Sequence, residues 1–185
     1  GGRRDGGEAE DTPAAQGGFL PAIPFDAEAR GIPPGSLGDI APAHLLALEV
    51  AARALDDAGY ADRPFDRSRA AVIFAAGTGD APSPQAADGA SPPTITGWIA
   101  ERLDLGGAEC TIADASPAAL DAACKELVCG GADLVLCGGV ELRDEAPGGP
   151  PSGRCASFDA GADGVAPGEG AACVALKRLA DAERD

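Results

Sequence analysis

Apolar residues recur along the chain in two patterns, one typical of helices and one typical of buried strands. Spacings of three and four predict a helix over residues 42–58 that ends at Gly59, and its buried stripe comprises Leu45, Leu48, Ala52 and Leu55. The run AAVIFAAG at residues 70–77 is continuously apolar with β-branched residues at its centre, which is typical of a parallel strand covered on both faces. Together the patterns indicate helices packed on a sheet.

The second half of the chain continues this alternation. A helix is predicted where apolar residues recur at helical spacing, namely Ile95, Trp98, Ile99 and Leu103. AECTIAD (108–114) and DLVLCGGVE (133–141) predict strands, and AACVALKRLADAERD (171–185) predicts a strand that runs into a helix. The helix after Ser116 should stop at glycines 130–131, with an apolar face of Leu120, Cys124, Leu127 and Val128. This order predicts an α/β fold with a mostly parallel sheet covered by helices.

The chain is expected to form one domain behind a tail. Residues 1–17 are Gly, charged residues and Ala without periodicity, so we expect a disordered tail or linker followed by a domain over residues 18–185. Loops rich in Gly and Pro are expected at 80–93 and 142–170. Because aromatic residues make up only 4% of the 185 residues, the core must consist of Ala, Val, Leu and Ile.

Charge and cysteine usage exclude several classes of function. The formal net charge of −16 repels phosphate, which excludes nucleic acid and anionic membranes as partners. No apolar run approaches the roughly 20 residues of a membrane span, and no signal-peptide core is present, so we expect a cytoplasmic protein. Six cysteines without a CxxC pair and a single histidine predict no metal site and no cofactor. The cysteines are expected to be small buried hydrophobes, with Cys155 the most exposed.

The stretch TIADASPAALDAAC at residues 111–124 contains the candidate site residue. Ser116 and Pro117 open an amphipathic helix, a position where a nucleophile would be well placed. The same pair is also a preferred N-cap and first helical residue, because the hydroxyl accepts a bond from an unpaired N–H and proline has no N–H to leave unpaired. We favour the structural cap, which contributes about 1 kcal/mol, over the nucleophile.

Several stretches, in order from about residue 17 to the end, resemble the N-terminal half of a β-ketoacyl synthase, the condensing domain of polyketide, fatty-acid and polyunsaturated-fatty-acid synthases. They are GGFLPAIPFDAEARGIPP, LLALEVAARALDDAGY, ITGWIAERLDLGG, AALDAACKEL, ADLVLCGGVEL and SGRCASFDAGADGVAPGEGAACVALKRLADAERD. In the last of these, FDAGADG and GEG resemble a loop that packs beside the synthase active site, and they are equally typical of tight turns. The resemblance implies a thiolase-like half-fold.

The chain departs from this family at the catalytic residues and at its start. The resemblance puts the family's catalytic cysteine at Ser116, where a hydroxyl needs a general base that a thiolate does not need. The family takes two histidines from its C-terminal half, whereas the single His44 aligns with an ordinary family glutamine. Family members also begin with a hydrophobic strand at the centre of the sheet. Residues 1–18 cannot form that strand, so either the sheet lacks it or another segment or chain supplies it.

These departures predict a truncated, catalytically inactive ketosynthase-like domain with a structural, dimerisation or docking role in a polyketide or fatty-acid megasynthase. Thiolase-fold subunits pair through the strand that leads into the nucleophile, so we expect a homodimer, or pairing with an intact ketosynthase, through residues 108–114. Two alternatives stay open. One is acyl transfer or condensation that uses Ser116 or is completed by a second chain, and the other is a module that binds an acyl carrier protein or an acyl chain.

Overall fold

The structure is a computed structural model that describes residues 18–21, 23–77, 94–113, 116–142, 152, 155–164 and 168–185. The expected tail at 1–17 and the expected loop at 80–93 lie outside these ranges and stay predictions. The chain forms two compact units, one of Gly1–Phe19 with Arg143–Gly168 and one of Leu20–Leu142 with Glu169–Asp185. All helices and strands of the described residues belong to the second unit.

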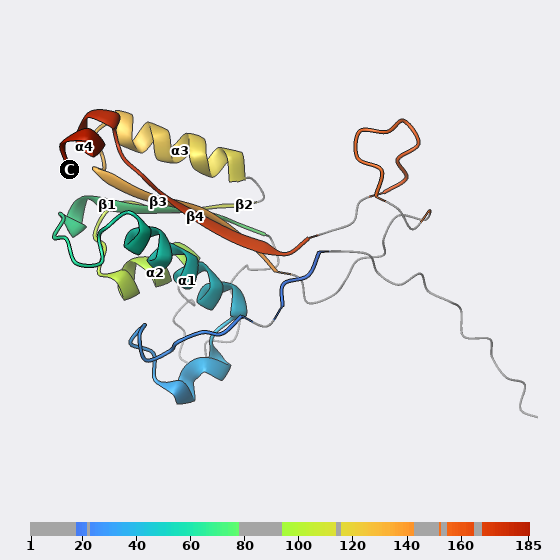
Figure 1. Ribbon diagram of the computed structural model, residues 1–185, viewed down its shortest axis with the longest axis horizontal. Coiled ribbons are helices and arrows are strands. Elements are labelled where there is room, and N and C mark those ends of the chain that lie inside the picture. The colour runs from blue at the N-terminus through green and yellow to red at the C-terminus, as the bar shows by residue number, and fades with distance from the viewer. Residues whose placement is uncertain are drawn as a thin grey trace, which may run out of the picture. The chain divides into compact units, whose positions relative to one another are not determined.

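The second unit is built on a four-stranded sheet in the order β2-β1-β3-β4 (Figure 1). Its strands are β1 (Ala70–Ala76), β2 (Glu109–Ala113), β3 (Leu134–Glu141) and β4 (Gly170–Leu176). β1 is parallel to both β2 and β3, and β4 is antiparallel to β3. The predicted α/β fold with a mostly parallel sheet is therefore confirmed, and the last strand is its antiparallel member.

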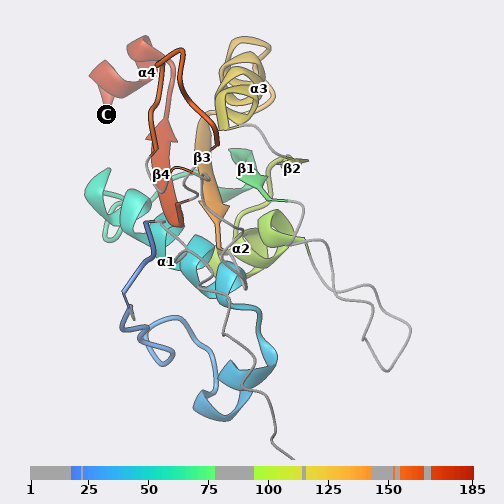
Figure 2. The same ribbon diagram turned by 90° about the vertical axis from the view of Figure 1, so that its right-hand side faces the viewer.

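Helices cover both faces of this sheet (Figure 2). They are α1 (Pro42–Asp57), α2 (Ile95–Leu103), α3 (Ser116–Val128) and α4 (Leu179–Arg184). Short 3-10 turns precede α1 at Pro34–Asp39 and β1 at Arg67–Arg69. The sheet has a hydrophobic core on each face, and alternate residues of β1, which is wholly buried, contribute to the two cores. Val72 and Phe74 pack with α1 and α2, whereas Ala71 and Ile73 pack with α3. Alternation of side chains across a strand thus explains why a continuous apolar run was needed.

Glycines end two of the helices as the sequence predicts. Gly59 has φ +79° and the N–H of Tyr60 donates to the carbonyl of Leu55 at 2.9 Å, which closes α1. Gly130 has φ +75° and the N–H of Gly131 donates to the carbonyl of Glu126 at 3.0 Å, which closes α3. A residue with a side chain is strained at positive φ, so each stop depends on its glycine.

The centre of the sheet is a direct ladder between β1 and β3. Residues 70–76 pair in parallel register with residues 134–140, and no other described strand lies between them. The described residues therefore agree with the alternative in which the sheet lacks the first strand that the family resemblance led us to expect. Phe74 stands opposite Gly138, and a Cβ on Gly138 would lie 2.4 Å from Phe74 Cζ and 2.6 Å from the carbonyl oxygen of Ala172.

The apolar face predicted for α3 is partly wrong. The buried residues follow a spacing of four along the helix and are Ala119, Ala123 and Leu127. Only Leu127 belongs to the predicted face, while Leu120 is 46% exposed, Val128 is 82% exposed and Cys124 is exposed as well. Small alanine side chains let the helix approach the sheet closely, which turns the larger apolar side chains outward.

The expectation of buried cysteines holds for only part of the set. Cys137 on β3 is buried and Cys173 on β4 is partly buried, whereas four cysteines are exposed, namely Cys110, Cys124, Cys129 and Cys155. The exposure of Cys155 was predicted. The other three are exposed because β2 is an edge strand and because the outer side and end of α3 face away from the sheet.

An ionic cluster joins the end of α3, β3 and the segment before α4. Arg178 donates to the carbonyls of Leu127 at 3.0 Å and Ala132 at 2.8 Å, and also to the Asp133 carboxylate. Arg69, next to β1, donates to the other oxygen of that carboxylate. Hydrogen bonds from Arg69 and then from Arg178 hold the pKa of Asp133 well below its usual range. The cluster ties together segments that are distant in sequence.

Asp133→Asn should lower the melting temperature at pH 7 by roughly 3 °C, because a partly exposed ion pair contributes little and is screened. The depressed pKa means that Asp133 stabilises the fold above its unfolded pKa of about 4, and that this contribution is lost as the pH falls further. The difference between wild type and variant should therefore shrink from pH 4 to pH 2 in thermal unfolding followed by circular dichroism. Asp121→Asn, which removes a pair with Lys125 within one helix, is the control and should change little.

Within the first unit, the described residues form short turns. Asp159 Oδ1 accepts the N–H of Gly161 at 2.7 Å, and Asp163 accepts both the N–H and the hydroxyl of Ser152 at 2.8 and 2.9 Å. Gly18 and Gly168 form an isolated parallel bridge. These contacts fit the turn interpretation of the FDAGADG segment.

None of the described helices has both the length and the apolar character that crossing a membrane requires.

Candidate functional site

Ser116 begins α3 directly beyond the carboxyl end of β2. Residues 114–115 and the Ser116 side chain lie outside the described part of the structure, so the competing cap and nucleophile roles both stay predictions. Two residues separate β2, which ends at Ala113, from the start of α3, and the first turn of a helix has unpaired N–H groups. The start of α3 is where the resemblance puts the catalytic residue of its family.

The topology gives the start of α3 a further property. α2 follows β1 and packs on one face of the sheet, whereas α3 follows the adjacent β2 and packs on the opposite face. Neighbouring strands whose connections leave to opposite faces form a crevice at their carboxyl ends, where ligands of open α/β sheets bind. Ser116 therefore starts its helix at the switch point of this sheet.

Among the described strands, β2 lies at an edge of the sheet and has an exposed surface. Four of its five residues are exposed and only Ile112 is partly buried. The N–H of Val72 donates to the carbonyl of Ala108 at 2.9 Å, which identifies the backbone groups that face β1. Every second residue faces the same neighbour in a parallel ladder, so the N–H and carbonyl of Thr111, and of Glu109 before it, face the open edge.

A chain of threonine hydroxyls orients β2 against α2. Thr94 Oγ1 accepts the N–H of Gly97 at 3.1 Å and lies 3.2 Å from Thr96 Oγ1. Thr96, which is buried, bonds through its hydroxyl to Thr111 Oγ1 at 3.0 Å. The sequence analysis did not predict these bonds between threonine hydroxyls. The available signal was a threonine N-cap before the apolar helix.

The described thiols on β3 and β4 are poor nucleophiles. Burial raises the pKa of Cys137, and it raises the pKa of Cys173 to about 12, so both stay protonated at neutral pH. His44 is partly buried on α1, with its ring edge-on to Trp98 at 6.3 Å between centroids. Within the described ranges, no three His, Cys, Asp or Glu side chains gather so that they could hold a metal ion.

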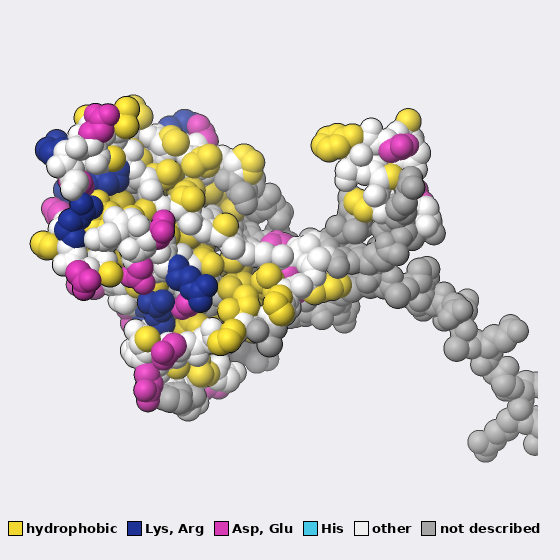
Figure 3. All heavy atoms as spheres, viewed as in Figure 1, with side chains coloured by type: hydrophobic (Ala, Val, Ile, Leu, Met, Phe, Trp, Pro, Cys, Tyr) yellow, Lys and Arg dark blue, Asp and Glu magenta, His cyan; other side chains and the backbone are white. Residues whose placement is uncertain are grey.

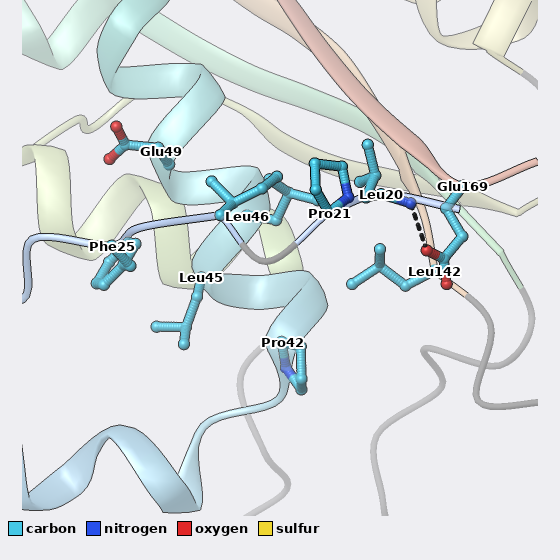
Figure 4. Close-up of a pocket in the computed structure, with 10 residues that line it drawn as sticks. Leu20, Pro21, Phe25, Pro42, Leu45, Leu46, Glu49, Leu142 and Glu169 are labelled. Atoms are coloured by element: carbon cyan, nitrogen blue, oxygen red, sulfur yellow. Dashed lines mark hydrogen bonds between the residues drawn. The ribbon is translucent and has the colours of Figure 1, made fainter. Parts of the chain in front are cut away.

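An apolar groove of about 250 Å³ lies beside the first two turns of α1 (Figure 4). Its walls are residues 20–21 and 23–25, the helix itself and Leu142 after β3. It is lined by Leu20, Pro21, Ile23, Phe25, Pro42, Leu45, Leu46, Glu49, Leu142 and Glu169. The close-up shows Glu49 and Glu169 toward opposite ends, with the apolar side chains between them. Sequence reasoning assigned Leu45 to the buried stripe of the helix and missed the groove.

The two carboxylates of this groove are held in different ways. Glu49 accepts hydrogen bonds from Arg30 at 3.1 Å and Arg53 at 2.7 Å, which form ion pairs with it. Glu169 Oε2 accepts the N–H of Leu20 at 3.0 Å, although the two residues are 149 positions apart. This bond holds the backbone of Leu20 beside the start of β4.

Residues 3–182 match the family model described as beta-ketoacyl synthase, N-terminal domain. The chain is 38% identical over 192 residues to a phenolphthiocerol/phthiocerol polyketide synthase polypeptide of Mycobacterium tuberculosis, a match that covers 91% of this chain and 12% of that protein. It is 32% identical over 195 residues to a PKS-NRPS hybrid synthetase of Aspergillus niger, covering 91% of this chain and 10% of the relative. The chain thus spans about a tenth of the length of these curated relatives.

Solved structures show the same likeness. The ketosynthase from module 6 of the bacillaene synthase of Bacillus subtilis 168 superposes with a TM-score of 0.71 at 29% identity. The match covers 87% of this chain and 31% of the ketosynthase. The fold of this chain is therefore similar to part of a ketosynthase.

Proposed function

Because the chain belongs to the β-ketoacyl synthase family, whose N-terminal domain it matches, we propose that it is a structural segment of a polyketide synthase. In this role it pairs with another domain and carries out no condensation itself. Its similarity to parts of polyketide synthases and to ketosynthase domains supports the proposal that it belongs to a polyketide synthase. Ser116 in place of the family's cysteine supports catalytic silence. The proposed partner is a second copy or an intact ketosynthase.

The open edge of β2 is the observation that carries this proposal. The strand exposes four of its residues and directs the N–H and carbonyl of Thr111 away from β1. An unpaired strand edge is a template for another strand, and an antiparallel pair of β2 edges from two copies would satisfy these groups on both sides. An edge of this kind, left unpaired, would also promote aggregation.

Thr111→Pro should weaken the self-association of the chain at least tenfold. Proline removes the outward N–H at the centre of β2 and adds a ring there, yet it leaves the bonds from β2 to β1 in place, because edge strands tolerate proline. Sedimentation velocity over a range of protein concentrations measures the effect, and far-ultraviolet circular dichroism checks that the fold is retained.

Thr111→Val is the matched control. It loses the hydroxyl bond to Thr96 but keeps the backbone N–H, so association should match that of the wild type. If the proline variant associates as tightly as the valine variant, pairing does not use this edge and the proposal fails.

A second candidate function is condensation completed by another polypeptide, and the outer face of α3 favours it. Leu120, Cys124 and Val128 form an exposed, mainly apolar stripe on the helix that begins at Ser116. Exposed apolar side chains aligned along a helix are typical of a surface that another segment covers. Acyl transfer to Ser116, tested as described in the Discussion, separates this candidate from the silent segment.

A further inference from the structure

We propose that the strand which pairs with β2 comes from a second copy of this chain, and that the two strands lie antiparallel with Thr111 of one copy opposite Thr111 of the other. The inference rests on the proposed pairing role and deepens it, because it names the partner and the register of the two strands. In this register Cys110 of each copy stands opposite Ile112 of the other copy.

The backbone of β2 determines which residues can bond across such a pair. The N–H of Val72 donates to the carbonyl of Ala108, so the even-numbered residues of β2 bond to β1. The odd-numbered residues Glu109, Thr111 and Ala113 direct their backbone groups outward. Because these positions are symmetric about Thr111, an antiparallel copy of the same edge would satisfy all of them at once. A shift by one residue would oppose outward groups to groups already bonded to β1, and a shift by two would leave one residue pair unmade.

The side chains on the α3 face of β2 complement each other in the same register. Cys110 lies beside Ile73 in the ladder and Ile112 lies beside Ala75, and both neighbours belong to the core under α3. Opposite side chains are closest in the pairs that do not exchange backbone bonds, and Cys110 with Ile112 is such a pair. Each Ile112, which is only partly buried in one copy, would then gain an apolar neighbour from the other.

The single charge of β2 also fits this register. Glu109 is the one charged residue of the strand and would stand opposite Ala113 of the other copy. The two Glu109 residues would be four positions apart along the strands, about 14 Å, at a rise of about 3.4 Å per residue. This separation exceeds the Debye length of roughly 8 Å at physiological ionic strength, so their repulsion is largely screened. A shift by two residues toward the start of the strand would halve the separation.

The surface around α4 is less suited to a second copy. Figure 3 shows Lys and Arg side chains beside Asp and Glu side chains there. Arg178 and Arg184 form ion pairs with Asp181, and Arg178 also pairs with Asp133. Covering these charges would remove water from them at a cost in free energy, whereas β2 would bury one charge per copy at most.

Disulfide formation with diamide tests the register. Ile112→Cys places a thiol opposite Cys110 of the other copy, where Cα atoms about 4.5 Å apart lie within the range of roughly 4.4–6.8 Å that disulfides span. Diamide takes up the two thiol hydrogens as the S–S bond forms. This variant should form a bond between position 112 and Cys110 at least tenfold faster than the wild type joins two Cys110 residues, which would be diagonal neighbours about 7–8 Å apart.

The matched control combines Ile112→Cys with Cys110→Ala. It keeps the new thiol and removes its proposed partner, so bond formation through position 112 should be at least tenfold slower. Thr111→Pro added to Ile112→Cys should slow the reaction equally. Fragmentation of the linked peptides by mass spectrometry separates this bond from bonds of the exposed Cys124, Cys129 and Cys155.

A second pair of positions covers the case in which Ile112→Cys unfolds the chain. Glu109→Cys with Ala113→Cys alters two exposed residues that would stand opposite each other, with Cα atoms about 5.5 Å apart. Circular dichroism identifies which variants are folded, and this pair should link the two copies as Ile112→Cys does.

Sedimentation velocity of the reduced chains separates the register from the pairing itself. Chains that associate but link two Cys110 residues, or two positions 112, as fast as the mixed pair would overturn the register and leave β2 pairing intact. Association without any bond through these positions would overturn the register as well. Chains that do not associate at all would contradict the proposed pairing and this inference together.

Discussion

Gly138→Ala is expected to destabilise the fold by about 3 kcal/mol, equivalent to a fall in melting temperature of roughly 6–12 °C for a chain of this size. The new Cβ would lie 2.4 Å from Phe74 Cζ and 2.6 Å from the Ala172 carbonyl oxygen. The ring is fully buried and the carbonyl belongs to the ladder of β3 with β4, so neither can move away without disturbing the sheet. Urea unfolding followed by circular dichroism measures the loss.

Gly35→Ala is the matched control, because nothing lies within 4 Å of the Cβ it would add. It should change the free energy of unfolding by less than about 0.5 kcal/mol. Adding Phe74→Leu to Gly138→Ala should recover part of the stability, since it removes the ring contact and leaves the carbonyl contact. A midpoint of Gly138→Ala equal to that of the wild type would mean that β1 and β3 do not pair directly in solution.

Ser116→Cys is expected to turn an unreactive position into an acyl acceptor, whereas position 116 of the wild type should stay unmodified when the chain is incubated with hexanoyl-N-acetylcysteamine. In the variant, a thiolate attacks the thioester carbonyl, the new thioester forms on the protein, and N-acetylcysteamine leaves as its thiolate. A thiol with a pKa near 7 at a helix N-terminus is about half ionised at pH 7, against about 3% for a pKa of 8.5. A serine hydroxyl needs a general base for the same attack.

Peptide mass spectrometry at pH 7 should find acylation at position 116 of the variant at least fivefold faster than at Cys124, the exposed thiol in the same helix. Ser116→Ala gives the background from the native cysteines. An acyl group on the wild-type chain that is lost in Ser116→Ala would contradict catalytic silence and favour an enzyme. Equal rates at position 116 and Cys124 would instead mean that the start of α3 does not activate a nucleophile.

Local patterns predicted the helices and strands well, because their signals lie within one segment. The continuous run at residues 70–77 became the buried β1, and the glycines at 59 and 130 ended their helices. The face of α3 was predicted less well, since leucine, cysteine and valine are more apolar than alanine. The close approach of helix to sheet, which selects alanine, depends on a partner that the segment itself does not reveal.

Some features of the candidate site could likewise be predicted from a local pattern, and others could not. Ser116 could be singled out because a turn before an amphipathic helix is visible in the sequence. The groove could not, because it depends on the bond between Leu20 and Glu169 across most of the chain. The bond between Thr96 and Thr111 also joins two elements, and no spacing rule connects them.

The direct contact of β1 with β3 has a geometric consequence for any mixed assembly. Adjacent strands are separated by about 4.8 Å, so a sheet without a central strand is narrower by that step. If this chain joins an intact ketosynthase along β2, the two halves of the shared sheet would differ in width. In this chain, β3 and the elements beyond it would lie closer to the seam between the two halves than their counterparts in the ketosynthase. Such a pair would lack true twofold symmetry, and its two sides would offer different surfaces to the rest of the synthase.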